Sequence, residues 1–315
     1  MVDEATFRNF SWVGDDESGC GYRFYADGMW PGGDPSARNF SCRRQYQAML
    51  HNADARVGAI EDALVKAGLW DQTLMTFMSD NGGSIDHSEN AASNYPLKGG
   101  KYSPWEGGIR VTSFWSGGFL PAASRGTTVD GLVHIADYFL TLCKLAGLSE
   151  TLCRTDAVAE AAGLPPIAGF DIWPLVSGAN ATSPRLEVPV DTHTLLVSDG
   201  DALWKYMDGK FTHATWVGPT FPNASGADPA GAPVEDCTAG CLFDVRADET
   251  EHNNVAAANP AVVAKMSARL AELVPNFYSN SDAGGTDLCP KGTQDCMCWA
   301  AKNLHSGFLG PWHQW

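Results

Sequence analysis

Two segments of the chain combine residue types that could bind an ionic ligand. Asp80 and Asn81 stand in SDNGG, directly after the apolar run TLMTFM, and Lys98 and Lys101 follow in LKGGKYSPWEGG. A carboxylate and an amide oxygen side by side are hard ligands suited to calcium or magnesium. Two cations beside a bound metal would make a site for a tetrahedral anion, sulfate or phosphate. On these residues alone, an Asp-Asn-Gly turn without an ion and a solvated surface lysine remain the alternative.

The elements around these segments predict an α/β fold that places Asp80 and Asn81 at the edge of a sheet. Apolar residues recur at three- and four-residue steps from Arg43 to Ala67, which predicts one helix that ends at Gly68. The run from Thr73 to Met78 predicts a short strand buried on both faces of a parallel sheet. Ligands of open α/β sheets bind beyond the carboxyl ends of the strands, which is where Asp80 and Asn81 stand.

A second strand and helix continue this pattern, and a different block follows them. The apolar patterns predict strands at 109–115, 194–198, 202–207 and 241–245, helices at 133–145 and 260–273, and irregular structure at 150–185. The strands at 194–198 and 202–207 form a predicted hairpin. We therefore expect an α/β domain at 1–188 and, at 189–315, a small antiparallel sheet with one helix and a Cys-rich tail.

The charge balance makes some partners unfavourable. The chain has 21 Lys and Arg against 37 Asp and Glu, a formal net charge of −16. An acidic field of this size repels nucleic acid and anionic membrane surfaces. No run of about 20 apolar residues occurs, so no membrane span is predicted. The sequence does not fix the oligomeric state.

Two features predict passage through the secretory pathway, to a lysosomal or extracellular destination, although no signal peptide is visible. Four Asn-x-Ser/Thr sequons are candidate glycosylation sites: Asn9, Asn39, Asn180 and Asn223. Several of the nine Cys lie in Gly-, Pro- and Asp-rich loops, where disulfides are more common than buried thiols. Zinc at Cys289, Cys296 and Cys298 is a less favoured alternative because the spacing fits no usual zinc pairing. Glycosylation and disulfide signals without a signal peptide lead us to expect a missing segment upstream of Met1.

SDNGG and NYPLKGGKYSPWEGGIR resemble segments of the type I sulfatases, especially the arylsulfatase B-like group. In that family a strand is followed by Ser/Thr-Asp-Asn-Gly-Gly, a loop, Leu-x-Gly-x-Lys and Trp-Glu-Gly-Gly-x-Arg. YQAMLHNADARVGAIEDALVKAGLWDQTLM, VDGLVHIADYFLTLCKLAGL and CLFDVRADETEHNNVA are similar to other family segments, so the resemblance covers about residues 43 to 275. It implies part of an alkaline-phosphatase-like mixed sheet flanked by helices, followed by a small C-terminal antiparallel sheet with one helix.

The resemblance also implies roles for individual residues. By position, Asp80 and Asn81 match the family's calcium ligands, and Lys101 matches the lysine that contacts the substrate's sulfate. Lys98 falls where the family varies, and the WEGGIR segment matches a part that is mainly structural. The family's nucleophile is a formylglycine made from Cys or Ser in Cys/Ser-x-Pro-x-Arg. Its hydrated aldehyde attacks sulfur, while calcium and lysine hold the sulfate oxygens and a His protonates the leaving alcohol.

That nucleophile motif does not occur in this sequence. The family's N-terminal Asp-Asp calcium pair, Lys-x-His segment and Val-His-x-Pro segment are missing as well. All of them would precede residue 1, so we expect the C-terminal part of a sulfatase, inactive alone, with two of the roughly six to eight oxygen ligands that calcium takes. The implied substrate is an aryl or glycan sulfate ester. The alternatives are a non-catalytic secreted relative that binds sulfated glycans and a metal-dependent phosphoesterase of the alkaline-phosphatase-like group.

Overall fold

The computed structural model describes residues 42–85, 92–161, 163, 166–216, 234–277, 286–293, 296–308 and 313–314. The chain divides into two compact units, Met1–Glu272 and Leu273–Trp315. Asp80, Asn81 and Lys101 all lie in the first unit. The domain boundary expected near residue 188 stays a prediction.

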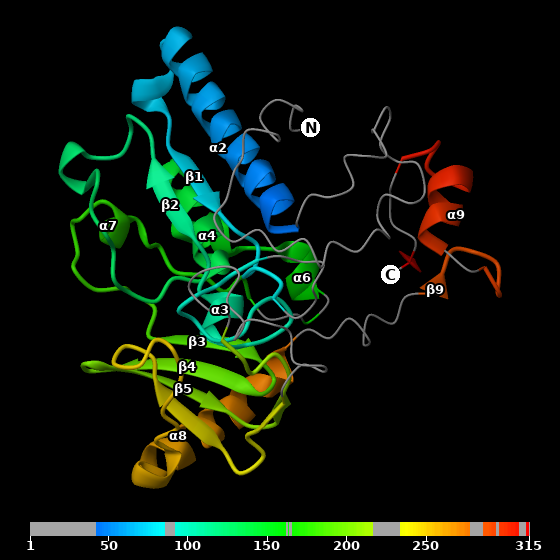
Figure 1. Ribbon diagram of the computed structural model, residues 1–315. Coiled ribbons are helices and arrows are strands. Elements are labelled where there is room, and N and C mark those ends of the chain that lie inside the picture. Colours follow the sequence, from blue (N-terminus) through cyan, green and yellow to red (C-terminus); the bar gives the residue numbers. More distant parts are fainter. Residues whose placement is uncertain are drawn as a thin grey trace. The chain divides into compact units, whose positions relative to one another are not determined.

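The first unit begins with α/β structure, in which a long helix precedes a two-stranded ribbon (Figure 1). The main elements are α2 (Cys42–Lys66), β1 (Met75–Met78), β2 (Ser113–Ser116) and α4 (Ile135–Leu145). The predicted helices and the predicted first strand are confirmed, whereas the strand expected at 109–115 is limited to Ser113–Ser116. The expected pairing of β1 is wrong for the described residues. β1 is half-buried along most of its length and pairs antiparallel with β2, with Phe77 opposite Phe114. A short run such as TLMTFM has no alternation that would indicate the direction of its neighbour.

Several short elements connect this part. They are α3 (Glu106–Ile109), α5 (Glu150–Arg154), α6 (Ala157–Ala161), α7 (Trp173–Val176) and 3-10 turns at Trp70–Gln72, Ala122–Ser124 and Ala256–Ala258. Three of these short helices lie in the 150–185 region, which the sequence analysis expected to be irregular. Local contacts explain α5: Ser149 Oγ accepts a hydrogen bond from the Leu152 amide at 3.2 Å, and a disulfide joins Cys153 to Cys143 in α4.

A four-stranded antiparallel sheet of order β3-β4-β5-β8 follows in the first unit. Its strands are β3 (Glu187–Asp191), β4 (Thr194–Asp199), β5 (Ala202–Met207) and β8 (Cys241–Asp244), with a small pair β6 (Lys210–Phe211) and β7 (Glu235–Asp236) beside them in sequence. The predicted hairpin is confirmed as β4 and β5. Figure 1 shows helix α8 (Pro260–Leu273) beside this sheet. Ion pairs from Arg269 to Glu187 and from Lys265 to Asp199 join the helix to it.

The second unit is small. Its described elements are a 3-10 turn at Val274–Asn276, β9 (Thr286–Asp287), α9 (Cys296–Asn303) and β10 (His313–Gln314), and β9 pairs antiparallel with β10. Cys289 and Cys296 form a disulfide. The zinc alternative for this region is therefore wrong, because two of the three proposed sulfur ligands are bonded to each other. The prediction of disulfides is confirmed here and at Cys143–Cys153 and Cys237–Cys241.

Apolar side chains are covered unevenly among the described residues. Trp105, Met207 and Phe243 lie in a closed core beneath the four-stranded sheet. By contrast, Met49 and Ile60 of α2 are exposed, as are the stacked rings of Phe77 and Phe114 on the ribbon. The helix of the predicted apolar stripe is thus present, but the described residues leave much of its stripe uncovered. None of the described helices is long and apolar enough to cross a membrane.

Candidate functional site

The strand end carries the two predicted metal ligands in a turn that leaves them accessible. Asp80 is exposed and Asn81 half-buried directly after β1. The Ser79 amide donates to the Thr112 carbonyl oxygen at 3.0 Å, and Ser79 Oγ donates to the Asn81 carbonyl oxygen at 2.7 Å. Within the described part of the chain, the Asp80 carboxylate has no hydrogen bond or ion pair. It can therefore accept a ligand without first breaking an internal contact.

The loop that carries Lys101 returns to this strand end. The Lys101 amide donates to the Gly83 carbonyl oxygen at 3.1 Å. Asn94 connects the same segments with its side chain: Oδ1 accepts from the Gly83 amide at 2.8 Å, and Nδ2 donates to the carbonyl oxygens of Gly83 at 2.8 Å and Gly99 at 3.0 Å. The sequence analysis missed Asn94. The available signal was an amide residue in a Gly- and Pro-rich loop, where such side chains often bond to the backbone.

The glycines of both motifs are needed for backbone-to-backbone packing. A Cβ on Gly82 would lie 1.7 Å from the carbonyl oxygen of Gly107, and one on Gly100 would lie 2.3 Å from that of Gly83. The Gly82 amide also donates to the Gly108 carbonyl oxygen at 2.9 Å. The backbones of the SDNGG, LKGGK and WEGG segments therefore pack directly against one another, with no room for side chains at these glycines.

The two lysines of the loop have different roles. Lys101 is half-buried, with Nζ 5.3 Å from the centroid of the Tyr102 ring, and it makes no ion pair among the described residues. Lys98 is buried and forms an ion pair with Glu235, with its Nζ 3.8 Å from the centroid of the Trp105 ring. The expectation that both cations frame an anion is therefore wrong for Lys98, whose charge is already neutralised inside the protein. Lys101 alone remains for a ligand.

Behind the loop lies a buried charge cluster, which we define as Glu106, Lys205 and Glu251. Lys205 Nζ lies 3.1 Å from Glu106 Oε1 and 2.7 Å from Glu251 Oε1, and the Glu106 amide donates to Glu251 Oε2 at 2.8 Å. Burial raises the pKa of Glu251, an effect that Lys205 opposes and Glu106 reinforces. The cluster joins the WEGG segment to β5. Sequence reasoning missed it because its members are far apart in the chain.

Trp105 adds an apolar attachment at the same place. Its side chain is fully buried, edge-on to the rings of Phe211 and Phe243 at centroid distances of 6.0 and 5.9 Å. Trp105 Nε1 donates to the Thr212 carbonyl oxygen at 3.2 Å, and the Gly99 amide donates to that of Thr215 at 2.8 Å. The loop is thus attached to the core of the four-stranded sheet on one side and to the strand end of Asp80 on the other.

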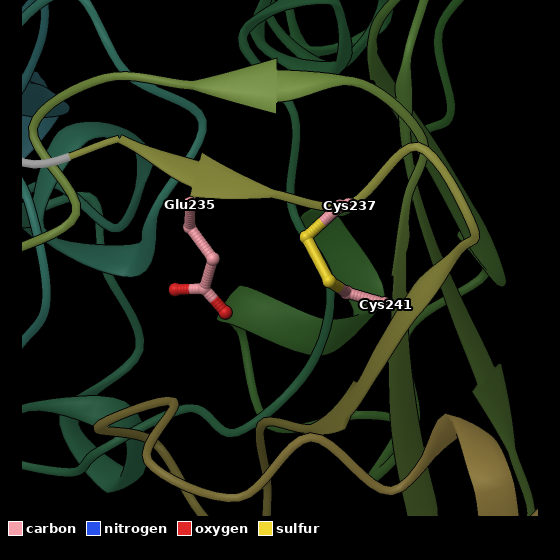
Figure 2. A group of neighbouring side chains, drawn as sticks. All are labelled: Glu235, Cys237 and Cys241. Carbon is pink, nitrogen blue, oxygen red and sulfur yellow. A yellow bond between two sulfur atoms is a disulfide. The ribbon is translucent and has the colours of Figure 1, made fainter.

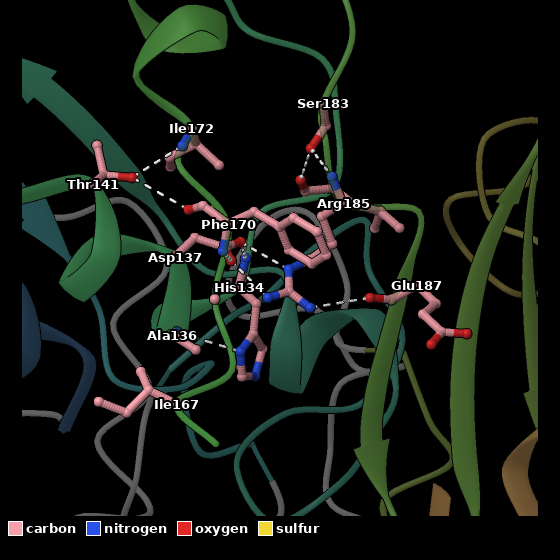
Figure 3. Close-up of polar contacts among 12 residues, drawn as sticks. His134, Ala136, Asp137, Thr141, Ile167, Phe170, Ile172, Ser183, Arg185 and Glu187 are labelled. Atoms are coloured by element: carbon pink, nitrogen blue, oxygen red, sulfur yellow. Dashed lines mark hydrogen bonds and ion pairs between the residues drawn. The ribbon is translucent and has the colours of Figure 1, made fainter. Parts of the chain in front are cut away.

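A second polar network attaches α4 to its surroundings (Figure 3). The Asp137 carboxylate, fully buried, is bound by Arg185 Nη2 at 2.6 Å and Nε at 2.8 Å, and it also accepts from the amides of His134 at 2.7 Å and Phe170 at 2.8 Å. Burial lowers the pKa of His134, and the positive charge of Arg185 lowers it further. His134 is thus kept neutral near pH 7, which suits a capping role: its Nδ1 accepts from the Ala136 amide at 3.3 Å.

A third cluster has ligand types suited to a transition metal but is otherwise occupied. One ligand atom each of Glu235, Cys237 and Cys241 lies within 4.8 Å of the others. Figure 2 shows that the two sulfur atoms are joined as a disulfide. Glu235 is in turn paired with Lys98. This cluster is therefore structural.

The oxygen atoms of Asp80 and Asn81 fit calcium in type but not in number. Among the described residues, the one group of three His, Cys, Asp or Glu side chains close enough to share an ion does not include Asp80. A full calcium shell would need several further oxygens. Of the sequons, Asn180 is exposed just after α7, whereas Asn9, Asn39 and Asn223 lie outside the described residues.

Comparison with known proteins shows which group this chain resembles. Residues 5–148 match the family model Sulfatase, a span that contains Asp80, Asn81 and Lys101 and starts well before the motifs noted in the sequence. Mouse arylsulfatase J is 27% identical over 295 residues, 86% of this chain and 45% of the mouse protein. Human arylsulfatase A is 28% identical over 234 residues, 71% of this chain and 42% of the human protein. The chain is thus similar to the sulfatases, and the family model covers 144 of its 315 residues.

Solved structures of other proteins share the fold of this chain. PsFucS1 sulfatase from Pseudoalteromonas sp. matches with a TM-score of 0.52 and 22% identity, over 73% of this chain and 44% of that one. Ps i-CgsB, solved in complex with k-i-k-neocarrahexaose, also matches with a TM-score of 0.52 and 22% identity, over 76% and 46% of the two chains. The mixed α/β sulfatase fold expected from the sequence is thus confirmed. The chain spans less than half the length of these relatives.

Proposed function

We propose that this chain is the C-terminal part of a calcium-dependent sulfatase that hydrolyses aryl or glycan sulfate esters. One observation carries the proposal: Lys101 lies in a loop that is hydrogen-bonded to the strand end of Asp80 and Asn81. Lys101 has no ion-pair partner among the described residues. A cation beside accessible oxygen ligands suits a metal-bound tetrahedral anion such as the singly charged sulfate group of an ester.

Each residue has a distinct role in this proposal. Asp80 and Asn81 would hold the calcium ion, which supplies Lewis-acid polarisation of a sulfate oxygen. The Lys101 ammonium would bind the sulfate group and stabilise negative charge as it develops on the oxygens. The interlocked glycines keep the Lys101 backbone from shifting, so this charge is positioned before the substrate arrives. The nucleophile, the general acid and the remaining calcium ligands would come from outside this chain.

Three observations support a larger functional protein. The curated relatives extend well beyond the matched region, and the Cys/Ser-x-Pro-x-Arg motif is absent from this sequence. The ribbon of β1 and β2 is a third sign, because among the described residues no further strand pairs with either and their phenylalanines are exposed. Open strand edges with apolar side chains are a liability unless other structure covers them.

The surface and disulfides support a secretory glycoprotein. Asn180 is exposed in its sequon, and three disulfides are formed among the described residues. We propose lysosomal or extracellular localisation, with glycans at Asn180 and at Asn9, Asn39 and Asn223. A sulfated small molecule or glycan is the proposed substrate, and the acidic net charge of −16 disfavours a nucleic-acid partner.

The test is to map the N-terminus of the native protein and to assay it on p-nitrophenyl sulfate and p-nitrophenyl phosphate, with calcium and with chelator. We expect a protein clearly larger than 33.7 kDa, with peptides upstream of Met1 and calcium-dependent sulfatase activity. Lys101→Ala should lower kcat/KM by about 100-fold or more, as loss of a transition-state charge contact does. Lys210→Ala is the control, because Lys210 is an exposed lysine paired with Asp236.

The alternatives give different results in the same assays. A native protein that starts at Met1 and does not hydrolyse either ester contradicts the catalytic proposal, and calcium-dependent binding of a sulfated glycan would then indicate a non-catalytic relative. Faster hydrolysis of the phosphate than of the sulfate would indicate a phosphoesterase. Equal loss of activity in the Lys101 and Lys210 variants would contradict the role of Lys101.

A further inference from the structure

A large aromatic ring lies exposed next to the proposed sulfate-binding lysine. Tyr102 is 74% exposed, although Gly100 and Trp105 in the same loop are buried. Its backbone has φ +73°, in the left-handed region that non-glycine residues rarely adopt. Backbone strain of this kind persists only where surrounding structure imposes it, and it is concentrated at ligand sites.

Surrounding contacts impose this conformation. Ser103 closes a turn around Tyr102: its amide and its Oγ both donate to the Gly100 carbonyl oxygen, at 3.1 and 2.8 Å. On the other side, the Lys101 amide is held by Gly83. The backbone on both sides of Tyr102 is thus fixed, and its ring projects outward beside the Lys101 ammonium, 5.3 Å from the ring centroid.

The C-terminal sheet region lies against the same ring. His213 is buried, also has a left-handed backbone at φ +60°, and its ring centroid lies 6.4 Å from that of Tyr102. The Thr215 amide donates to the His213 carbonyl oxygen at 2.8 Å, and Thr215 in turn accepts from the Gly99 amide. Two strained residues from distant segments therefore meet beside Lys101.

We propose that Tyr102 determines specificity by stacking on the aryl or sugar ring of a sulfate ester whose sulfate is bound by Lys101. This inference rests on the proposed sulfatase function. One bridging oxygen joins the sulfate to its ring, so a ligand held at Lys101 Nζ places that ring within reach of Tyr102. An exposed phenol suits such a partner because its face is apolar and its hydroxyl can hydrogen-bond.

The simpler role for Tyr102 is to hold Lys101 through a cation–π contact. The two roles predict different ligand dependence. A residue that only positions Lys101 affects every sulfate-like anion equally. A residue that contacts the organic ring affects only ligands that carry one.

The experiment uses the full native protein with calcium and measures binding of benzenesulfonate and methanesulfonate, which share the sulfonate group, resist hydrolysis and differ in the ring. Tyr102→Asn removes the aromatic ring but keeps a residue that tolerates left-handed backbone. It should weaken benzenesulfonate binding about threefold to tenfold, the range of one aromatic contact, and leave methanesulfonate within about twofold. Tyr102→Phe should bind both ligands like the parent protein.

Lys101→Ala separates failure of this inference from failure of the proposed function. If Lys101→Ala weakens both ligands but Tyr102→Asn weakens neither, or weakens both equally, the stacking role is wrong and the anion site stands. If Lys101→Ala changes neither affinity, the anion site itself is wrong. Circular dichroism and thermal melting of each variant verify that the fold is retained.

Discussion

Replacing Lys205 by Met tests whether the buried charge cluster holds the site loop in place. Met fills a similar volume without a charge, so the substitution removes the cation and leaves the packing nearly unchanged. Lys205 and Glu251 are each 0% exposed, and Glu106 is buried beside them. The variant therefore leaves two buried carboxylates without the ammonium that lies 3.1 and 2.7 Å from their oxygens.

Loss of one partner from a buried ion pair costs about 3–5 kcal/mol, and the cluster is too buried for solvent to reduce this value. Proton uptake sets the pH dependence. Burial already raises the pKa of Glu251 in the folded protein, and removal of Lys205, which lowers that pKa, lets it rise further. The folded variant then binds a proton more tightly than the unfolded chain. The contribution of Glu251 to the stability of the variant is therefore most favourable at low pH and is lost as pH rises through the raised pKa.

Urea unfolding of the native protein, followed by tryptophan fluorescence at pH 5 and pH 7, measures both effects. We expect Lys205→Met to lose about 3–5 kcal/mol at pH 7 and clearly less at pH 5. Lys265→Met is the matched control, since Lys265 and its partner Asp199 are 67% and 56% exposed; it should change stability by less than about 0.5 kcal/mol.

The double variant Lys205→Met/Glu251→Gln should recover part of the loss, because it removes one of the two uncompensated charges. A loss below about 1 kcal/mol at pH 7, or an equal loss at both pH values, would refute the view that the cluster is a buried charge network.

Two further predictions concern the other attachments of the fold. Gly82→Ala should lower the free energy of unfolding by about 1–3 kcal/mol and speed amide exchange in the site loop, because its Cβ would lie 1.7 Å from a backbone oxygen. Gly58→Ala is the control, since Gly58 lies in open space within helix α2, and it should be neutral or slightly stabilising. Similar effects of the two variants in thermal melts would contradict the close packing of Gly82. Arg185→Met should cost about 3–5 kcal/mol in urea unfolding because it leaves the Asp137 carboxylate buried and unpaired, whereas the exposed Arg246→Met should change little.

Helices were predictable where the periodic signal is long and has clear ends. The expected helix from Arg43 to Ala67 is found at Cys42–Lys66, and the one from Pro260 to Leu273 has the predicted bounds. A repeated apolar stripe and a glycine stop or an N-terminal proline are local properties of the chain. Strand pairing is not local, because the sequence of a four-residue strand such as β1 does not indicate which strand it pairs with or in which direction.

The same limit applies to the site. Residue type, spacing and resemblance predict Asp80, Asn81 and Lys101 as site residues, and their segments meet at one strand end, while their binding roles stay a prediction. Lys98 could not be distinguished from Lys101 by these signals, since both are lysines of one glycine-rich loop. What separates them is Glu235, 137 residues away from Lys98, together with the ring of Trp216, whose centroid lies 4.7 Å from Lys98 Nζ. Such long-range partners follow only from the folded structure.

The four-stranded sheet and the segments next to it therefore hold the loop of the proposed site in place, although none of the proposed ligand-binding residues belongs to them. Between Lys98 and Glu106, the site loop is bonded to the sheet region by a buried ion pair, a buried tryptophan and the buried charge cluster. The strand end of Asp80 contributes backbone contacts through Gly83 and Asn94 on the opposite side. Lys101 lies between these two sets of attachments. Because buried charges are costly to leave unpaired, the loop that carries Lys101 is coupled to folding of the sheet region.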